Sequence, residues 1–234
     1  MLFPGEKGLE KGAESTYNVS APGKEKRRGR ETIASRRGRA LGKKDSFMKA
    51  AVFGAGNMGL DIAQVFAVKG HDVVVRDISD ELIQKGEERL KASLARQVEK
   101  GRRTQAEADA ISAKIVFTTN MRQAADADLI VEAIVENVSI KKDLFRQLDT
   151  IVKPEAIFAT NTSSISPTEL ASATKRADRF IGMHFFNPAT VMKLIEVIRG
   201  ANTSQETFTT IYELAQSLGK EPIEVAEAPG FVVN

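Results

Sequence analysis

Cysteine is absent from the 234-residue chain. Disulfide bonds and thiolate metal sites are therefore excluded, and nothing points to an oxidising destination. Long apolar runs are absent too. None approaches the ~20 residues that a membrane-spanning helix needs, and the N-terminus lacks the apolar segment of a secretory signal peptide. We expect a cytoplasmic protein with no membrane partner.

The positive charge of the chain is concentrated near its N-terminus. Residues 1–47 hold 12 Lys+Arg and 6 Asp+Glu, whereas residues 48–234 hold 22 and 25. The run EKRRGRETIASRRGRALGKK has the charge to contact nucleic acid or an anionic surface. It lacks the aromatic residues that stack on bases and the apolar periodicity of a folded segment. We therefore expect residues 1–47 to form a disordered leader and do not expect a nucleic-acid partner.

Met48 offers a second interpretation of this leader, because it stands directly before the first expected strand. Residues 1–47 would then lie upstream of the natural start of the protein. A transit peptide is disfavoured, since such peptides are poor in acidic residues and this segment has 6.

Strand-like and helix-like segments alternate from residue 48 onward. Residues 79–101 and 104–112 predict a helical hairpin with a break at Gly101, and residues 204–219 predict a late helix. Another helix follows Ser166, because an N-cap serine, a proline at the first position and a glutamate three residues on suggest a capping box. The strands expected between the helices are MKAAVFGAG, HDVVVRD, KIVFTT, ADLIVEAIV, AIFATNTS, DRFIGMHFF, MKLIEVI and PIEVAE.

This alternation predicts an α/β fold: a Rossmann-type, doubly wound and mostly parallel sheet with an inserted helical hairpin. Residues 48–234 would form this one domain. Sheets of this kind bind ligands at the carboxyl ends of their strands. We therefore expect the chemistry in the polar loops that follow the expected strands.

The first of these loops, GAGNMG, has the spacing of a dinucleotide-binding turn. It follows an apolar strand and opens a helix, whose N-terminal N–H groups attract phosphates. Asp77 ends the second strand, where a carboxylate accepts hydrogen bonds from a ribose and favours NAD over NADP. Arg76 beside it argues against a strict preference for NAD, because an arginine there can hold the extra phosphate of NADP. The expected cofactor-binding turn comprises Gly54, Ala55, Gly56, Asn57, Met58 and Gly59.

His184 and Glu196 are two polar residues set in apolar runs near the end of the expected sheet. On composition alone, we would interpret His184 as an ordinary core histidine with a hydrogen-bond partner. A glutamate within KLIEVI is rarely buried unless it is paired. A strand–turn–strand between them would bring the two together as an acid–base pair of the kind that removes a proton from an alcohol.

Five segments resemble the NAD-dependent L-3-hydroxyacyl-CoA dehydrogenases, a family that includes the 3-hydroxybutyryl-CoA dehydrogenases. They are GAGNMG, LIVEAIVEN, ATNTSS, HFFNPATVMKLIEVI and PGFVVN. The resemblance covers the chain from about Met48 to Asn234. It implies an oxidoreductase of fatty-acid metabolism that exchanges a hydride between an L-3-hydroxyacyl-CoA and NAD.

The resemblance also implies roles for individual residues. His184 matches the catalytic base and Glu196 the carboxylate that pairs with it. Ser163 and Asn234 match the residues that hold the substrate oxygen. The positions that match contacts with NAD, from the nicotinamide to the adenosine end, are Glu136, Lys141, Ser163, Asn187 and Asp77.

Ser93 and Lys100, on the expected helical hairpin, match contacts with the CoA moiety. A cationic lysine beside phosphates is physically sensible. Members of the family continue past the motif at Asn234 into a helical domain that makes dimer contacts and closes over the acyl-CoA. We expect that C-terminal domain to be missing here, so that the partner is a second copy or a separate helical domain. The alternative is a chain that binds NAD without full activity.

Overall fold

The computed structural model describes residues 48–227, which fall within one compact unit, Asp45–Asn234. The leader, residues 1–47, and the predicted catalytic residue Asn234 lie outside the described range, and the expectations for them stay predictions. Within residues 48–227, no helix has the length and apolar character of a membrane span.

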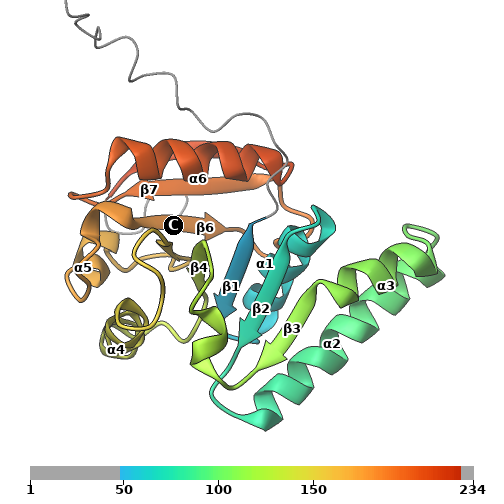
Figure 1. Cartoon of the computed structure of the whole chain (residues 1–234). Helices are drawn as coiled ribbons and strands as arrows, with labels where there is room; N and C mark the ends of the chain where they lie inside the picture. The colour runs from blue at the N-terminus through green and yellow to red at the C-terminus, as the bar shows by residue number, and fades with distance from the viewer. Residues whose placement is uncertain (1–47, 228–234) are drawn as a thin grey trace, which may run out of the picture. The chain divides into compact units, whose positions relative to one another are not determined.

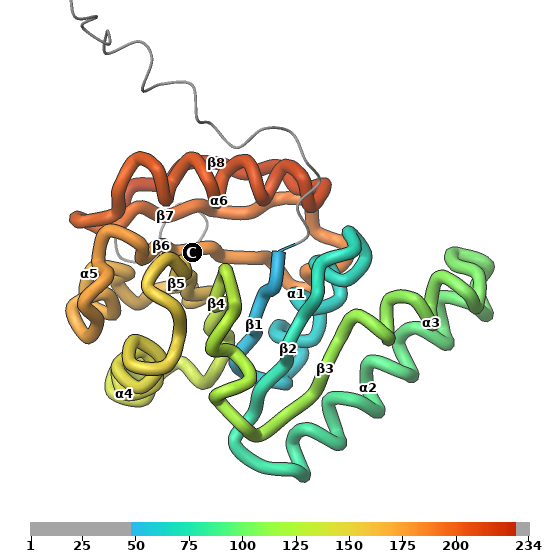
Figure 2. The backbone as a smooth tube through the Cα atoms, viewed as in Figure 1, coloured from blue at the N-terminus to red at the C-terminus, as the bar shows by residue number. Residues whose placement is uncertain are grey.

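Eight strands form one sheet in the order β3-β2-β1-β4-β5-β6-β7-β8 (Figures 1 and 2). The first six in chain order are parallel, β7 is antiparallel to β6, and β8 is parallel to β7. The mostly parallel sheet predicted from the sequence is therefore confirmed. The strands are β1 (Lys49–Phe53), β2 (Asp72–Arg76), β3 (Ile115–Thr118), β4 (Leu129–Glu132), β5 (Ile157–Thr160), β6 (Phe180–Phe185), β7 (Leu194–Arg199) and β8 (Glu221–Ala226).

Helices cover both faces of this sheet, as Figure 1 shows. One apolar core lies between the sheet and α1 (Asn57–Val68), α2 (Asp80–Glu99), α3 (Gln105–Ala113) and α6 (Gln205–Ser217). The other lies between the sheet and α4 (Val138–Asp149) and α5 (Pro167–Ala171). Successive strand residues enter opposite cores, as the pleat requires. Two short 3-10 turns, η2 (Met121–Ala124) and η3 (Ala177–Arg179), were not predicted.

The predicted helical hairpin is present as α2 and α3, and Thr104 forms a complete capping box with Glu107. The capping box expected at Ser166 is only half formed. The Ser166 hydroxyl accepts a hydrogen bond from the Glu169 N–H, but the Glu169 carboxylate pairs with Lys142 at 2.9 Å. The fourth strand was predicted to reach residue 135 and ends at Glu132. The reason is that Ile134 donates its N–H to the Glu132 side chain instead of to a neighbouring strand.

The turn between β1 and α1 depends on its glycines. Gly54 has φ +111, and a Cβ there would lie 2.5 Å from the Ala133 carbonyl oxygen. A Cβ on Gly59 would lie 1.8 Å from the Gly54 carbonyl oxygen, so the helix can pack this closely on the strand only without a side chain. A Cβ on Gly56 would meet nothing within 4 Å. The outer side of the turn therefore faces open space.

Replacing Gly59 by alanine should destabilise the fold, whereas Gly56→Ala should be tolerated. The first adds a methyl group inside a closed contact, which typically costs ~1–3 kcal/mol. The second adds it where there is room and at an ordinary φ of −72, so its cost should stay within about 1 kcal/mol. Urea unfolding of both variants measures the difference. Equal free energies of unfolding would contradict the packing assigned to Gly59.

Candidate active site

The carboxyl ends of β4, β5 and β6 meet at one edge of the sheet, where a cavity of about 370 Å³ opens beside the start of α1. The prediction that the polar loops after these strands gather at one edge is therefore confirmed. Predicted site residues from four separate segments line this cavity together. They are Met58, Glu136, Lys141, Ser163, His184 and Asn187.

His184 and Glu196 form the pair that the sequence predicted. They stand directly opposite each other in the antiparallel register of β6 and β7, so their side chains leave the same face of the sheet. The Nδ1 atom of His184 lies 2.8 Å from the Glu196 Oε2 atom. Glu196 is fully buried and His184 is 7% exposed. A buried carboxylate against Nδ1 fixes the orientation of the ring and directs the Nε2 edge to proton exchange with a substrate.

The loop after β5 shapes the wall beside this pair. The Asn161 side-chain oxygen accepts a hydrogen bond from the Phe185 N–H at 2.8 Å and so ties this loop to the strand that carries His184. The Thr162 hydroxyl donates to Glu136. Burial raises the pKa of Glu136, but the Thr162 hydroxyl and the positive charge of Lys141 outweigh it, and the net pKa lies below the ordinary value. Glu136 is therefore ionised at neutral pH.

Sequence reasoning missed Glu132, which is the buried anchor of Lys141. The ammonium group of Lys141 lies 2.5 Å from Glu132 Oε1 and 3.1 Å from Glu136 Oε2. The other Glu132 oxygen accepts a hydrogen bond from the Thr160 hydroxyl at 2.7 Å. Glu132 is 0% and Lys141 1% exposed. The signal was available, because a glutamate inside LIVEAIV is as anomalous as one inside KLIEVI.

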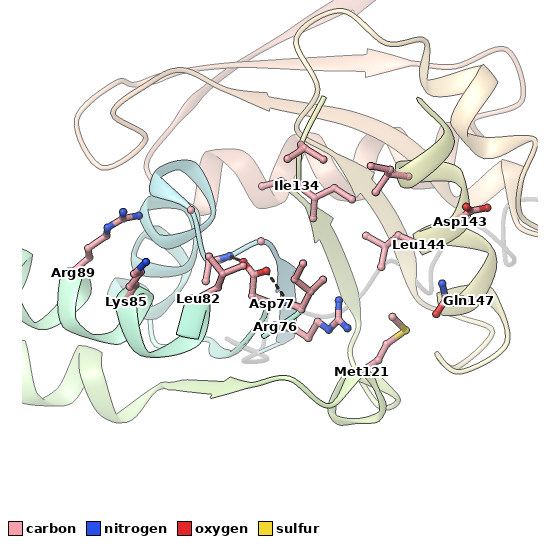
Figure 3. A pocket seen from close by; sticks show the side chains of 17 residues that line it. Arg76, Asp77, Leu82, Lys85, Arg89, Met121, Ile134, Asp143, Leu144 and Gln147 are labelled. Carbon is pink, nitrogen blue, oxygen red and sulfur yellow. Dashed lines mark hydrogen bonds between the residues drawn. The ribbon is translucent and has the colours of Figure 1, made fainter. Parts of the chain in front are cut away.

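A second cavity, of about 590 Å³, borders the β1–α1 turn at Gly54, Ala55 and Gly56 (Figure 3). Asp77 and Arg76, at the end of β2, form its floor, with Lys85 and Arg89 of α2 on one side and α4 on the other. Asp77 accepts hydrogen bonds from the N–H groups of Ala55 at 2.6 Å and Ile78 at 2.7 Å. It therefore contacts the turn, and its predicted contact with a ribose stays a prediction.

These features fit a dinucleotide. Gly56 caps α1 with an extended backbone and no side-chain hydrogen bond, and the first turn of α1 carries no acidic residue. The N–H groups and dipole at this helix end are therefore available to a pyrophosphate, which the open side of Gly56 lets approach. The larger cavity lies at one end of the turn, and the cavity with His184 lies at the other.

The residues predicted to contact CoA lie in a separate cavity of about 500 Å³. Ser93 and Lys100 line it, together with Arg96, Arg102 and Arg103. This cavity does not include His184. Asn187 and Ser93 share a smaller cavity of about 270 Å³, so the loop after β6 lies between the basic residues of α2 and the His184–Glu196 pair.

Comparison with known proteins agrees with this geometry. Residues 49–228 match the family model described as the 3-hydroxyacyl-CoA dehydrogenase, NAD binding domain. The chain is 50% identical over 187 residues to a 3-hydroxybutyryl-CoA dehydrogenase of Clostridioides difficile, covering 80% of this chain and 66% of that protein. It is 52% identical to a probable 3-hydroxybutyryl-CoA dehydrogenase of Deinococcus radiodurans, covering 80% and 67%.

The fold agrees as well. The crystal structure of (S)-3-hydroxybutyryl-CoA dehydrogenase from Ralstonia eutropha matches with a TM-score of 0.79 and 46% identity, covering 81% of this chain and 67% of that one. The chain thus spans about two thirds of the length of these relatives. By its matched residues, its sheet and its glycine turn, the chain belongs to the 3-hydroxyacyl-CoA dehydrogenase family, of which it contains the NAD-binding domain.

Proposed function

We propose that this protein transfers a hydride reversibly between an L-3-hydroxyacyl-CoA, for example 3-hydroxybutyryl-CoA, and NAD, giving the 3-ketoacyl-CoA and NADH. The observation that carries the proposal is the buried contact of 2.8 Å between His184 and Glu196 at the edge of the NAD-binding sheet. The relatives named as 3-hydroxybutyryl-CoA dehydrogenases support the substrate class.

In this reaction His184 takes the hydroxyl proton of the substrate through Nε2, because Nδ1 faces Glu196. Glu196 stabilises the imidazolium that forms, since a positive charge created at a buried site is favoured by a neighbouring carboxylate. Ser163, in the same cavity, holds the substrate oxygen as it becomes a carbonyl. Bound NAD would accept the hydride that leaves the substrate carbon bearing this oxygen.

The basic cavity on α2 supports a CoA ester rather than a free hydroxy acid as the substrate. Lys100, Arg102 and Arg103 are exposed or partly exposed cations beside Ser93, and such a group suits the phosphates of a nucleotide. Acting in the cytoplasm, the chain would work as a homodimer or with a separate helical domain. If the site is incomplete alone, the chain is an NAD-binding module without full activity.

Turnover of acetoacetyl-CoA with NADH should depend on His184 and not on His71. These are the chain's two histidines, and His71 sits away from the cavity, where its Nδ1 accepts a hydrogen bond from the Met48 N–H. His184→Ala should lower kcat/KM by ~10²–10⁴, the usual contribution of general acid–base catalysis. His71→Ala should leave it unchanged. Absorbance of NADH at steady state measures both.

Glu196→Gln should also slow this reaction, because the amide keeps the shape of the side chain but cannot stabilise an imidazolium. We expect a loss of about 10²-fold or more in kcat with little change in KM.

Turnover that survives in His184→Ala would refute the assignment of the base. Binding of NADH without any turnover in the wild-type chain would identify an NAD-binding module.

Gly56→Ala should weaken NADH binding although the fold tolerates it. Its methyl group would occupy the open side of the turn, where the pyrophosphate approaches. We expect the Kd for NADH to rise at least about tenfold, measured by NADH fluorescence. An exposed change at the other end of α1, Val68→Ala, controls for helix effects. An unchanged Kd in Gly56→Ala would place the pyrophosphate elsewhere.

A further inference from the structure

The connection between β6 and β7, residues 186–193, joins the strand of His184 to the strand of Glu196 and carries Asn187. Most of it is exposed, including Val191 at 68% and Met192 at 41%. Ala189, at 1%, is the buried point in its middle. Its own hydrogen bonds are few: the N–H groups of Val191 and Met192 both donate to the Pro188 carbonyl.

Two oppositely charged side chains hold this connection from outside. The Asp61 carboxylate, in α1, faces the backbone N–H groups of Thr190 and Ala189, which act to lower its pKa. Lys220, directly before β8, donates from Nζ to the Ala189 carbonyl at 2.5 Å and to the Met192 carbonyl at 2.7 Å. The carboxylate thus faces N–H groups of the connection and the ammonium group binds its carbonyl oxygens, with Ala189 next to both side chains.

Burial disfavours the charge on both side chains. Burial raises the pKa of Asp61, although the N–H groups of Thr190 and Ala189 and the charge of Lys220 oppose it. Burial likewise lowers the pKa of Lys220, against the opposing effect of Asp61. Both shifts disfavour the charged forms in the folded chain, so at neutral pH each charge subtracts from the free energy of unfolding. Two different elements, α1 and the residue before β8, thus present a charged side chain to the backbone of the same connection, which points to a role in positioning.

We propose that Asp61 and Lys220 are positioning residues that clamp the β6–β7 connection and thereby fix Asn187 between the cavity of the catalytic pair and the basic cavity of α2. Asn187 lines the first of these cavities with His184 and shares another with Asp61, Ser93 and Arg96. Asp61 lies in the second turn of α1, whose N-terminus is the end at which we expect the pyrophosphate of NAD to bind. The helix that binds NAD therefore also holds the loop beside the nicotinamide site. The inference rests on the proposed function for the role of Asn187.

The test compares Asp61→Asn and Lys220→Met in the full chain with Lys193→Met as the matched control. Lys193 lies in the same connection, but its side chain is 74% exposed and lies 3.6 Å from Glu221. NMR follows hydrogen exchange of the Ala189 and Thr190 amides, and fluorescence gives the Kd for NADH. Both clamp variants should speed exchange and raise Kd by roughly 3–10-fold, the loss of one or two hydrogen bonds.

Lys220→Arg keeps the charge and the donors, so it should restore both quantities towards the wild-type values, which a loss of general stability would not explain. Wild-type exchange and Kd in Asp61→Asn and Lys220→Met would overturn the clamp. So would an equal effect of Lys193→Met. A wild-type chain that binds NADH but shows no His184-dependent turnover would overturn the proposed function alone. In that case the amide hydrogen-exchange rates and the Kd for NADH would still test whether Asp61 and Lys220 hold the connection.

Discussion

The contact between His184 and Glu196 depends on a change of direction in the sheet. The six parallel strands end at one edge of the sheet, where the loops that follow them gather. β6 is the last of these strands, and the parallel strands alone place no residue directly opposite His184 on its free side. The antiparallel β7 supplies one, because direct opposition in an antiparallel pair brings side chains to within contact distance on one face. A carboxylate with 0% exposure tolerates that position only beside a partner. The reversal of β7 therefore makes the buried pair possible.

A second group of buried charges lies beside the same cavity and follows the same rule, that a buried charge needs a partner. Lys141 lies between Glu132 and Glu136, two carboxylates from the end of β4 and its loop. Removing one partner of such a buried pair typically costs about 3–5 kcal/mol, because the other charge is left without compensation. Glu132 draws the lysine inward from α4, and the Thr160 hydroxyl holds Glu132 in turn. The cation beside the cavity is thus fixed by the sheet and is not a mobile surface lysine.

A structural feature could be predicted from the sequence when the residues that cause it are close together in the chain. The glycine turn, most helix caps and most apolar strands depend on neighbours in sequence, and they appear where the pattern places them, although β4 ends early at Glu132. The His184–Glu196 pair was also predictable, because 12 residues span one hairpin. Glu132 depends on Thr160, 28 residues away, and Asp61 on a loop more than a hundred residues on. Their partners are set by packing between elements, which no local pattern encodes. The half-formed capping box at Ser166 failed for the same reason, since Glu169 is drawn to Lys142 on α4.

Helix α1 shows how one element can serve several parts of a site at once. Its N-terminus lies on the glycine turn, where the missing Cβ of Gly59 lets it pack against β1. About one turn further on, Asp61 faces the connection between β6 and β7. A rigid helix transmits displacement along its axis with little loss, because its backbone hydrogen bonds and buried face oppose bending. A shift of α1 against the sheet would therefore move the glycine turn and the side chain of Asp61 together. Close packing at Gly59 limits that shift and so also holds Asp61 in place against the connection that carries Asn187.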